Sequence, residues 1–284
     1  MTENGRKLLV VDGSNLLFQM FYGMPARILD KAGKPIHGTL GFVGALLKMI
    51  RRTEPTHVVV LFDGEHRNER KDADENYKAN RPDFSQMPEE ETPFSQLPDI
   101  YAALDYLKIL HAETTVCETD DVVAAYALRY GEDMSIVIAS FDSDFFQLIT
   151  DKVSVFRYRG ENSVLCDSAY VQEKFGVAPA QYADYKSLVG DTADNVKGVR
   201  GIGPKTAAKL IARFGDIPTL LANTEQIERL SVRKAIEEER ERILLNVRLI
   251  KLCGCEEIPF EISSLAYRYR GERTGEVLAA IGIK

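Results

Sequence analysis

The chain has 284 residues, of which 45% are hydrophobic, so it can bury a sizeable core, and this argues against disordered and fibrous proteins. Its formal net charge of −7 argues at first against nucleic-acid binding, because phosphate groups are normally bound by Lys and Arg. It has no apolar run of the ~18 to 20 residues that cross a bilayer and no secretory signal at its start, so we expect a cytoplasmic protein without a membrane partner.

Three short apolar runs predict strands buried on both faces, at 8–11 (LLVV), 58–62 (VVVLF) and 136–139 (IVIA). Between them, apolar residues recur at helical spacing over 40–50 and 122–130. This alternation predicts an α/β fold with a mainly parallel central sheet flanked by helices. Ligand sites in such sheets lie beyond the carboxyl ends of the strands.

Acidic residues follow all three predicted strands, and others begin the second predicted helix. They are Asp12, Asp63, Asp142 and Asp144 after the strands, and Glu118, Asp120 and Asp121 at the helix. Singly, each can be a turn residue or a helix cap. Together, carboxylates at one sheet edge repel each other unless a cation compensates, and their hard oxygens favour magnesium or manganese. Two such ions about 4 Å apart suit phosphodiester hydrolysis.

A glycine-rich segment follows Asp191 and Asp194 and predicts a hairpin that leads into a helix beginning at Pro204. The segment 200–213, RGIGPKTAAKLIAR, has four basic residues and no acid, which indicates a local basic surface. Such a turn can hold a DNA backbone without reading bases. An ordinary helical hairpin, in which the glycines serve geometry alone, is the alternative.

Four cysteines are few for this length: Cys117, Cys166, Cys253 and Cys255. The Cys-Gly-Cys pair has no second pair to complete a zinc site. We expect all four to be reduced and mostly structural.

Six motifs in order resemble the 5′ nuclease or flap endonuclease family, which includes the N-terminal exonuclease domain of bacterial DNA polymerase I and stand-alone relatives. The resemblance covers nearly the whole chain. The motifs are VDGSN (11–15), FDG (62–64), YKANRP (77–82), ETDD (118–121), DSD (142–144) and GDTADN (190–195), the last followed by GVRGIGPKTA.

The resemblance implies a PIN-like α/β catalytic domain over 1–175, with a helical arch at about 64–98. It implies a C-terminal helical region over 176–284, with a helix-hairpin-helix element at about 190–214. The helices expected between Thr224 and Arg248 would support that element.

The resemblance also implies two Mg²⁺ ions, for which Mn²⁺ can substitute. It assigns Asp12, Asp63, Glu118 and Asp120 mainly to the first ion, Asp142 to a position near both, and Asp144, Asp191 and Asp194 to the second. Asp121 matches a further acid of the family that acts through bound water.

Three residues of the arch match the family pattern. The resemblance implies that Lys78 and Arg81 stabilise charge on the scissile phosphate and that Tyr77 stacks on a base. From composition alone, the charges of 67–81 nearly cancel, and a solvated helix with i,i+4 pairs is the alternative.

The hairpin supplies the expected DNA contacts, and in the family it can also bind K⁺ through backbone carbonyls. The residues expected to contact DNA are Lys197, Arg200, Gly201, Gly203, Lys205, Thr206 and Lys209. Implied substrates are DNA with 5′ flaps, nicks, gaps or 5′ overhangs, including RNA-primed DNA, in replication and repair in the bacterial cytoplasm. The expected state is a monomer.

Two positions depart from the family pattern, Phe141 in place of a glycine and Lys197 in place of a proline, and neither removes a metal ligand. From the start at Met1 we expect a stand-alone nuclease, with an isolated N-terminal fragment of a polymerase as the alternative. Two other classes stay open: a related metal-dependent ribonuclease and a non-catalytic junction-binding protein.

Overall fold

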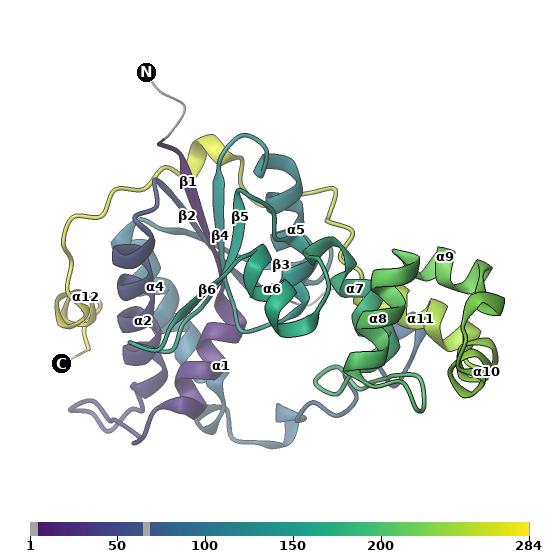
Figure 1. Ribbon diagram of the computed structural model, residues 1–284. Coiled ribbons are helices and arrows are strands. Elements are labelled where there is room, and N and C mark those ends of the chain that lie inside the picture. Colours follow the sequence, from purple (N-terminus) through teal and green to yellow (C-terminus); the bar gives the residue numbers. More distant parts are fainter. Residues whose placement is uncertain (1–4, 65–68, 284) are drawn as a thin grey trace.

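A six-stranded sheet forms the centre of the larger part of the protein (Figure 1). The computed structural model describes residues 5–64 and 69–283. Within them the strand order is β3-β2-β1-β4-β5-β6, with the first five strands parallel and β6 antiparallel to β5. The strands are β1 (Lys7–Asp12), β2 (His57–Asp63), β3 (Leu110–Thr114), β4 (Ser135–Ala139), β5 (Val153–Arg157) and β6 (Val164–Cys166).

The three predicted strands are the central ones, β1, β2 and β4. Their side chains alternate between two apolar cores, so that Leu8 and Val10 face one side of the sheet while Leu9 and Val11 face the other. All four are fully buried. The fold class expected from the apolar runs is therefore confirmed.

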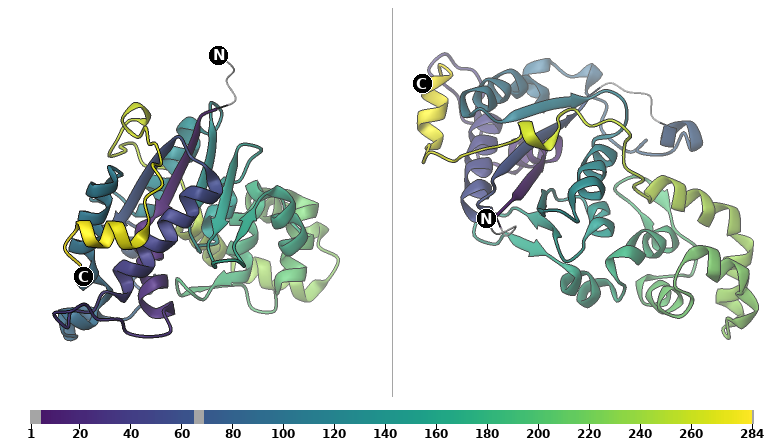
Figure 2. Two further views of the ribbon diagram at one scale, coloured as in Figure 1. Left: turned by 90° about the vertical axis from the view of Figure 1, so that its left-hand side faces the viewer. Right: turned by 90° about the horizontal axis from the view of Figure 1, so that it is seen from above.

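Helices cover both faces of the sheet (Figure 2). The core that contains Leu9 includes residues of α1, α2, α4 and α12, and the core that contains Leu8 includes residues of α5 and of the C-terminal helices. Those around the sheet are α1 (Gly13–Gly23), α2 (His37–Thr53), α4 (Leu97–Leu107), α5 (Thr119–Tyr130) and α12 (Thr274–Ala280).

The predicted arch segment is only partly helical. Residues 65–68 lie outside the described part; beyond them, α3 spans Glu69–Ala73, and 3-10 turns follow at Phe84–Gln86, Glu89–Glu91 and Pro93–Gln96. The solvated helix considered as the alternative over 67–81 therefore ends at Ala73 within the described residues. Asp74 accepts a 2.9 Å hydrogen bond from the backbone of Asn76, and such a side-chain turn competes with helix continuation.

Seven further helices and a two-stranded hairpin follow β6 within the described residues. The hairpin, β7 (Gly190–Asp191) and β8 (Val196–Lys197), joins α7 to α8. A Cβ atom on Gly198 would lie 2.1 Å from the Val189 carbonyl oxygen, so this crossing requires glycine. The helices are α6 (Ser168–Phe175), α7 (Tyr182–Val189), α8 (Pro204–Phe214), α9 (Ile217–Ala222), α10 (Leu230–Glu238) and α11 (Arg240–Ile250), with α12 at the end.

The chain returns to the sheet after α11, as the yellow segment of Figures 1 and 2 shows. The backbone of Val58 donates to Leu265 at 3.0 Å, and that of Tyr267 donates to Thr56 at 2.8 Å. Val277 of α12 then joins the core beneath α2 and α4. No helix among the described residues has the length and apolarity to span a membrane.

The cysteine prediction was wrong for two of the four residues. Cys117 and Cys255 form a disulfide, with Cα atoms 6.6 Å apart, while Cys166 is buried and free and Cys253 is exposed and free. The partners are 138 residues apart in sequence, and only the return of the chain after α11 brings them together.

Candidate metal centre and nucleic-acid interface

Asp12 stands where β1 ends and α1 begins. It caps α1 by accepting from the Asn15 backbone at 3.0 Å, and Ser140 Oγ donates to its other oxygen at 2.7 Å. Burial, with the nearby Asp63 and Asp142 carboxylates, raises the pKa of Asp12 to about 7. Both the cap role and the convergence of acids at one sheet edge are therefore observed.

Asp120, in the first turn of α5, belongs to the same group. Burial raises the pKa of Asp120 well above its usual value, and Asp142, Asp12 and Asp63 raise it further, while Lys78 opposes them. A group of buried like charges of this kind is stabilised when a cation shares the site.

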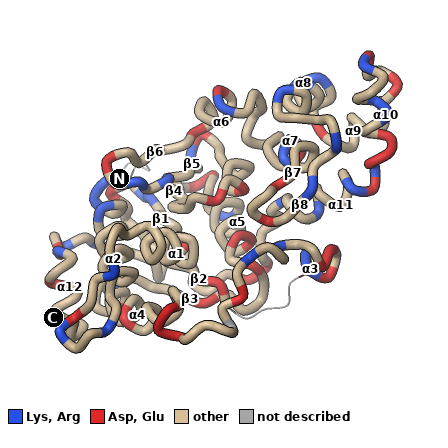
Figure 3. The backbone as a smooth tube through the Cα atoms, turned by 90° about the horizontal axis from the view of Figure 1, so that it is seen from below, with Lys and Arg blue, Asp and Glu red and all other residues tan. Residues whose placement is uncertain are grey.

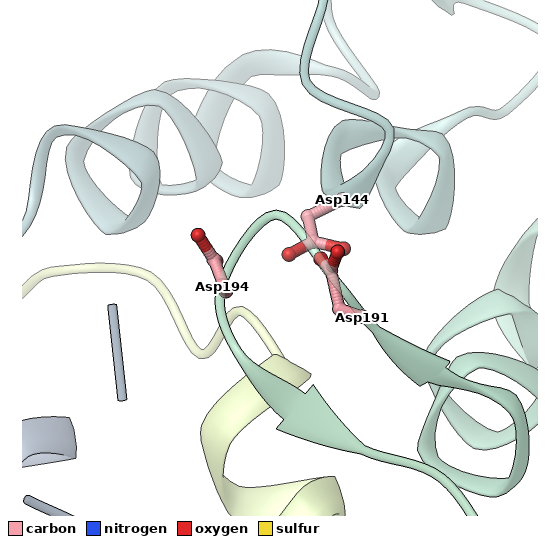
Figure 4. Close-up of side chains that lie close together, drawn as sticks. All are labelled: Asp144, Asp191 and Asp194. Atoms are coloured by element: carbon pink, nitrogen blue, oxygen red, sulfur yellow. The ribbon is translucent and has the colours of Figure 1, made fainter. Parts of the chain in front are cut away.

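A second carboxylate group consists of Asp144, Asp191 and Asp194 (Figure 4). One oxygen from each lies within 4.8 Å of the others. Asp144 follows β4, Asp191 lies on β7, and Asp194 lies in the turn before β8. Burial raises the pKa of Asp144 to about 7, with contributions from Asp142 and Asp191 and an opposing one from Lys186. These oxygens fit a hard divalent cation such as Mg²⁺ or Mn²⁺.

Lys186 was not predicted from the sequence, although it contacts the second carboxylate group. It lies on α7 with a buried side chain, donates to Asp144 Oδ1, and is 2.5 Å from Asp191 Oδ2. Burial alone would lower the pKa of Lys186, but Asp144, Asp142 and Asp191 raise it above the usual value. A single lysine among the buried residues of a helix, YADYKSLV, was the signal available.

Arg70 is a second cation that the sequence reasoning missed. Its guanidinium donates to Glu118, and it binds Asp121 through two nitrogens at 2.7 and 3.1 Å. Burial would raise the pKa of Glu118, but Lys78 and Arg70 hold it below the usual value. Asp121 therefore serves here as the partner of Arg70.

The three predicted arch residues all reach the carboxylates. Lys78 Nζ is 3.0 Å from Glu118 Oε1 and 3.8 Å from Asp120 Oδ2, and Arg81 is 3.0 Å from Asp194 Oδ1. Lys78 also has a φ of +57°, a region that side chains rarely adopt and that is common at functional sites.

Tyr77 does not match its predicted role in this conformation. Its side chain is 3% exposed and packs with Ala183, Val196 and Leu249, so no ring face is open to a base. Its hydroxyl lies 3.3 Å from Glu118 and 3.4 Å from Asp194, between the two carboxylate groups.

The hairpin and α8 present the expected basic surface, visible as blue along α8 in Figure 3, apart from the red of the carboxylate segments near α5 and β7. The buried face of α8 consists of Ala207, Leu210, Ile211 and Phe214. The predicted contact residues Lys197, Arg200, Gly201, Gly203, Lys205 and Lys209 are exposed, and Thr206 is half-buried. Gly201 has a φ of +82°, which a tight turn there requires.

Two family profiles divide nearly the whole chain between them. The profile described as 5′-3′ exonuclease, N-terminal resolvase-like domain, matches residues 7–176, and that described as 5′-3′ exonuclease, C-terminal SAM fold, matches residues 177–272.

Curated relatives include DNA polymerase I proteins. The thermostable enzyme of Thermus filiformis is 34% identical over 271 residues, which are 95% of this chain and 31% of the relative. The DNA polymerase I of Bacillus subtilis (strain 168) is 32% identical over 286 residues, which are 98% of this chain and 31% of the relative. The chain thus spans 31% of the length of these relatives.

Solved structures share the fold. The T5 D15 protein co-crystallised with metal ions gives a TM-score of 0.72 at 24% identity, covering 87% of this chain and 90% of that one. The catalytic core of Rad2 in complex with DNA substrate gives a TM-score of 0.58 at 14% identity, covering 98% of this chain and 93% of that one.

Proposed function

Because the chain belongs to the 5′-3′ exonuclease family, we propose that it is a divalent-metal-dependent 5′ nuclease that hydrolyses DNA phosphodiesters near free 5′ ends, flaps and nicks. The observation that carries this proposal is the pair of neighbouring carboxylate groups at the sheet edge, close to an exposed basic hairpin. Asp142 contributes to the raised pKa of Asp12, of Asp120 and of Asp144, and this supports the proposal that it acts near both groups.

The carboxylates divide between two Mg²⁺ ions, with Mn²⁺ as a substitute. Bound ions of this type supply activation of the attacking water and stabilisation of the leaving oxygen. Asp12, Asp63, Glu118 and Asp120 would hold the first ion, Asp144, Asp191 and Asp194 would hold the second, and Asp142 would contribute near both.

Lys78 and Arg81 provide positive charge for the scissile phosphate. In the structure they pair with Glu118 and Asp194, which are proposed metal ligands. If those acids held metal ions, the Lys78 and Arg81 side chains would be free to contact a phosphate oxygen. Tyr77 positions Lys78, whose ammonium is 4.9 Å from the centre of the tyrosine ring.

The hairpin holds the duplex next to the cut. Lys205 and Lys209 lie four residues apart on the same side of α8, so both can reach one phosphate backbone. Backbone carbonyls of the turn around Gly201 suit a K⁺ ion. Since these contacts read no bases, selectivity comes from DNA structure, which fits flaps, gaps, nicks and 5′ overhangs, and also RNA-primed strands removed during bacterial replication and repair. A monomer suffices for this activity.

Cleavage of a labelled 5′-flap duplex tests this function, beside a matched single strand, a 3′ flap and a single-stranded RNA, with Mg²⁺, Mn²⁺ or a chelator. We expect product from the 5′ flap with either metal and none with the chelator. Tight flap binding without product under either metal would favour a non-catalytic junction-binding protein, and cutting of single-stranded RNA alone would favour the ribonuclease class.

A further inference from the structure

Lys186 lies within the carboxylate group proposed to hold the second ion. Its ammonium contacts Asp144 and is 2.5 Å from Asp191, and its side chain is 8% exposed. We propose that Lys186 is an internal cation that stands in for the second metal ion, holding Asp144 and Asp191 together before the ion binds and weakening the affinity for that ion. The proposal rests on the nuclease function above.

The Lys186 ammonium lies among the carboxylate oxygens where a metal ion would bind. Three carboxylates supply oxygens within 4.8 Å of one another, and the lysine ammonium contacts two of them. Arg81 pairs with the third, Asp194, at 3.0 Å. The two cations therefore offset most of the charge of the group, which is the task that a divalent ion performs when bound.

A buried lysine at this place has two opposite effects. Without metal it stabilises the fold, because removing one partner of a buried ion pair leaves an uncompensated charge. With metal it repels the arriving ion, because two positive charges close together in a partly buried site interact unfavourably. A lysine with a purely structural role would have the first effect alone, so metal affinity separates the two interpretations.

Substrate changes this balance. The scissile phosphate brings negative charge to the same group of residues, so it offsets the repulsion between Lys186 and the second ion. Binding of that ion is then coupled to binding of DNA, and the site is seldom filled by an ion when DNA is absent.

Calorimetric titration of the full chain with Mn²⁺, without DNA, tests the proposal on the wild type, Lys186→Gln and Lys186→Arg. We expect Lys186→Gln to tighten the weaker of the two sites at least about ten-fold, or about 1.4 kcal/mol, and Lys186→Arg to leave it weak because the charge remains. Adding Asp144→Asn to the Lys186→Gln variant should remove the tightened site, and this loss would assign that site to the second carboxylate group. Lys34→Gln is the matched control, because Lys34 also pairs with an aspartate, Asp99 at 2.6 Å, outside both carboxylate groups.

Thermal unfolding with chelator and with Mn²⁺ provides a second readout. With chelator, Lys186→Gln should unfold at a lower temperature than the wild type. Mn²⁺ should raise the unfolding temperature of Lys186→Gln by more than it raises that of the wild type. If it is unfolded with chelator, Mn²⁺ should restore folding, and failure to do so would overturn the proposal. Equal Mn²⁺ affinity of the weaker site in the wild type and Lys186→Gln would overturn it too, leaving the nuclease function intact if the wild type cuts flaps. A wild type that binds no Mn²⁺ would overturn both.

Discussion

Replacement of Lys78 by alanine separates the chemical step from DNA binding. The lysine side chain is 9% exposed, and its ammonium is 3.0 Å from Glu118. Asp120 and Glu118 raise the pKa of Lys78 above its usual value against the effect of burial, so the side chain is charged at neutral pH. Losing one such charged donor to the transition state costs about 100- to 1,000-fold in rate, or about 2.7 to 4 kcal/mol.

The cost to folding should be smaller than for an isolated buried pair. Breaking such a pair costs about 3 to 5 kcal/mol, but Glu118 keeps Arg70 as a partner when Lys78 is removed. Thermal unfolding of Lys78→Ala checks that the variant is folded before its rate is interpreted.

The assay is single-turnover cleavage of a 5′ flap with Mg²⁺, together with flap affinity measured with Ca²⁺. We expect the rate to fall by the factor given above, while affinity changes only a few-fold. Lys34→Ala, which removes an ion pair with Asp99 elsewhere on the surface, should match the wild type in both measurements. A loss of affinity as large as the loss of rate would refute the assignment, because Lys78 would then act in binding.

Three other substitutions test the remaining parts of the site. Asp63→Asn should abolish cleavage but keep flap binding, because it removes a ligand charge and leaves the hairpin intact; unchanged turnover in single-turnover assays would exclude the role. Lys205→Ala should weaken binding of every DNA substrate and reduce the slope of log affinity against log salt by about 1, measured by fluorescence anisotropy at several salt concentrations; a loss confined to flaps would contradict a sequence- and structure-independent phosphate contact. Burial raises the pKa of Asp12 to about 7 in the folded protein, against about 3.9 in unfolded chains, so the folded state holds the extra proton and this group destabilises the protein as pH rises from about 4 to 7. Asp12→Asn should therefore gain stability over the wild type at pH 8 in chelator, by at most about 1.4 kcal/mol for each pH unit that separates the folded from the unfolded pKa, and a constant difference between the two proteins from about pH 4 to 8 in denaturant unfolding would argue against the raised pKa.

The central strands were predictable because their signal is local. β1, β2 and β4 are continuous apolar runs buried on both faces, which few other structures allow. β3 was missed because its sequence, LHAET, is half polar at the edge of the sheet, and β6 was missed because two of its three residues are exposed.

Asp191 and Asp194 were assigned through the family resemblance, whereas Asp12, Asp63, Asp142 and Asp144 could be predicted from strand ends, since parallel strands bring their carboxyl ends to one edge. Their cationic partners could not. Arg70 contacts Glu118, 48 residues away, and Lys186 contacts Asp144, 42 residues away; the lone lysine of α7 was a signal for a buried cation, but neither sequence names its distant partner. The disulfide between Cys117 and Cys255 escaped prediction for the same reason. Tyr77 matches its motif, but packing against α7 and α11 decides that the ring is buried.

The return of the chain to the sheet after α11 has a consequence for where the proposed nuclease would cut DNA. The helical part that includes the basic hairpin is joined to the α/β part at both of its ends, first through α6 and again through the strand-like pairing of Leu265 with Val58. A segment held at two ends resists rotation about either one, so the spacing between the duplex-holding turn and the carboxylates stays constant. In the proposed reaction, a constant spacing would set the number of nucleotides between the start of the duplex and the cleaved bond, whatever the sequence of the DNA.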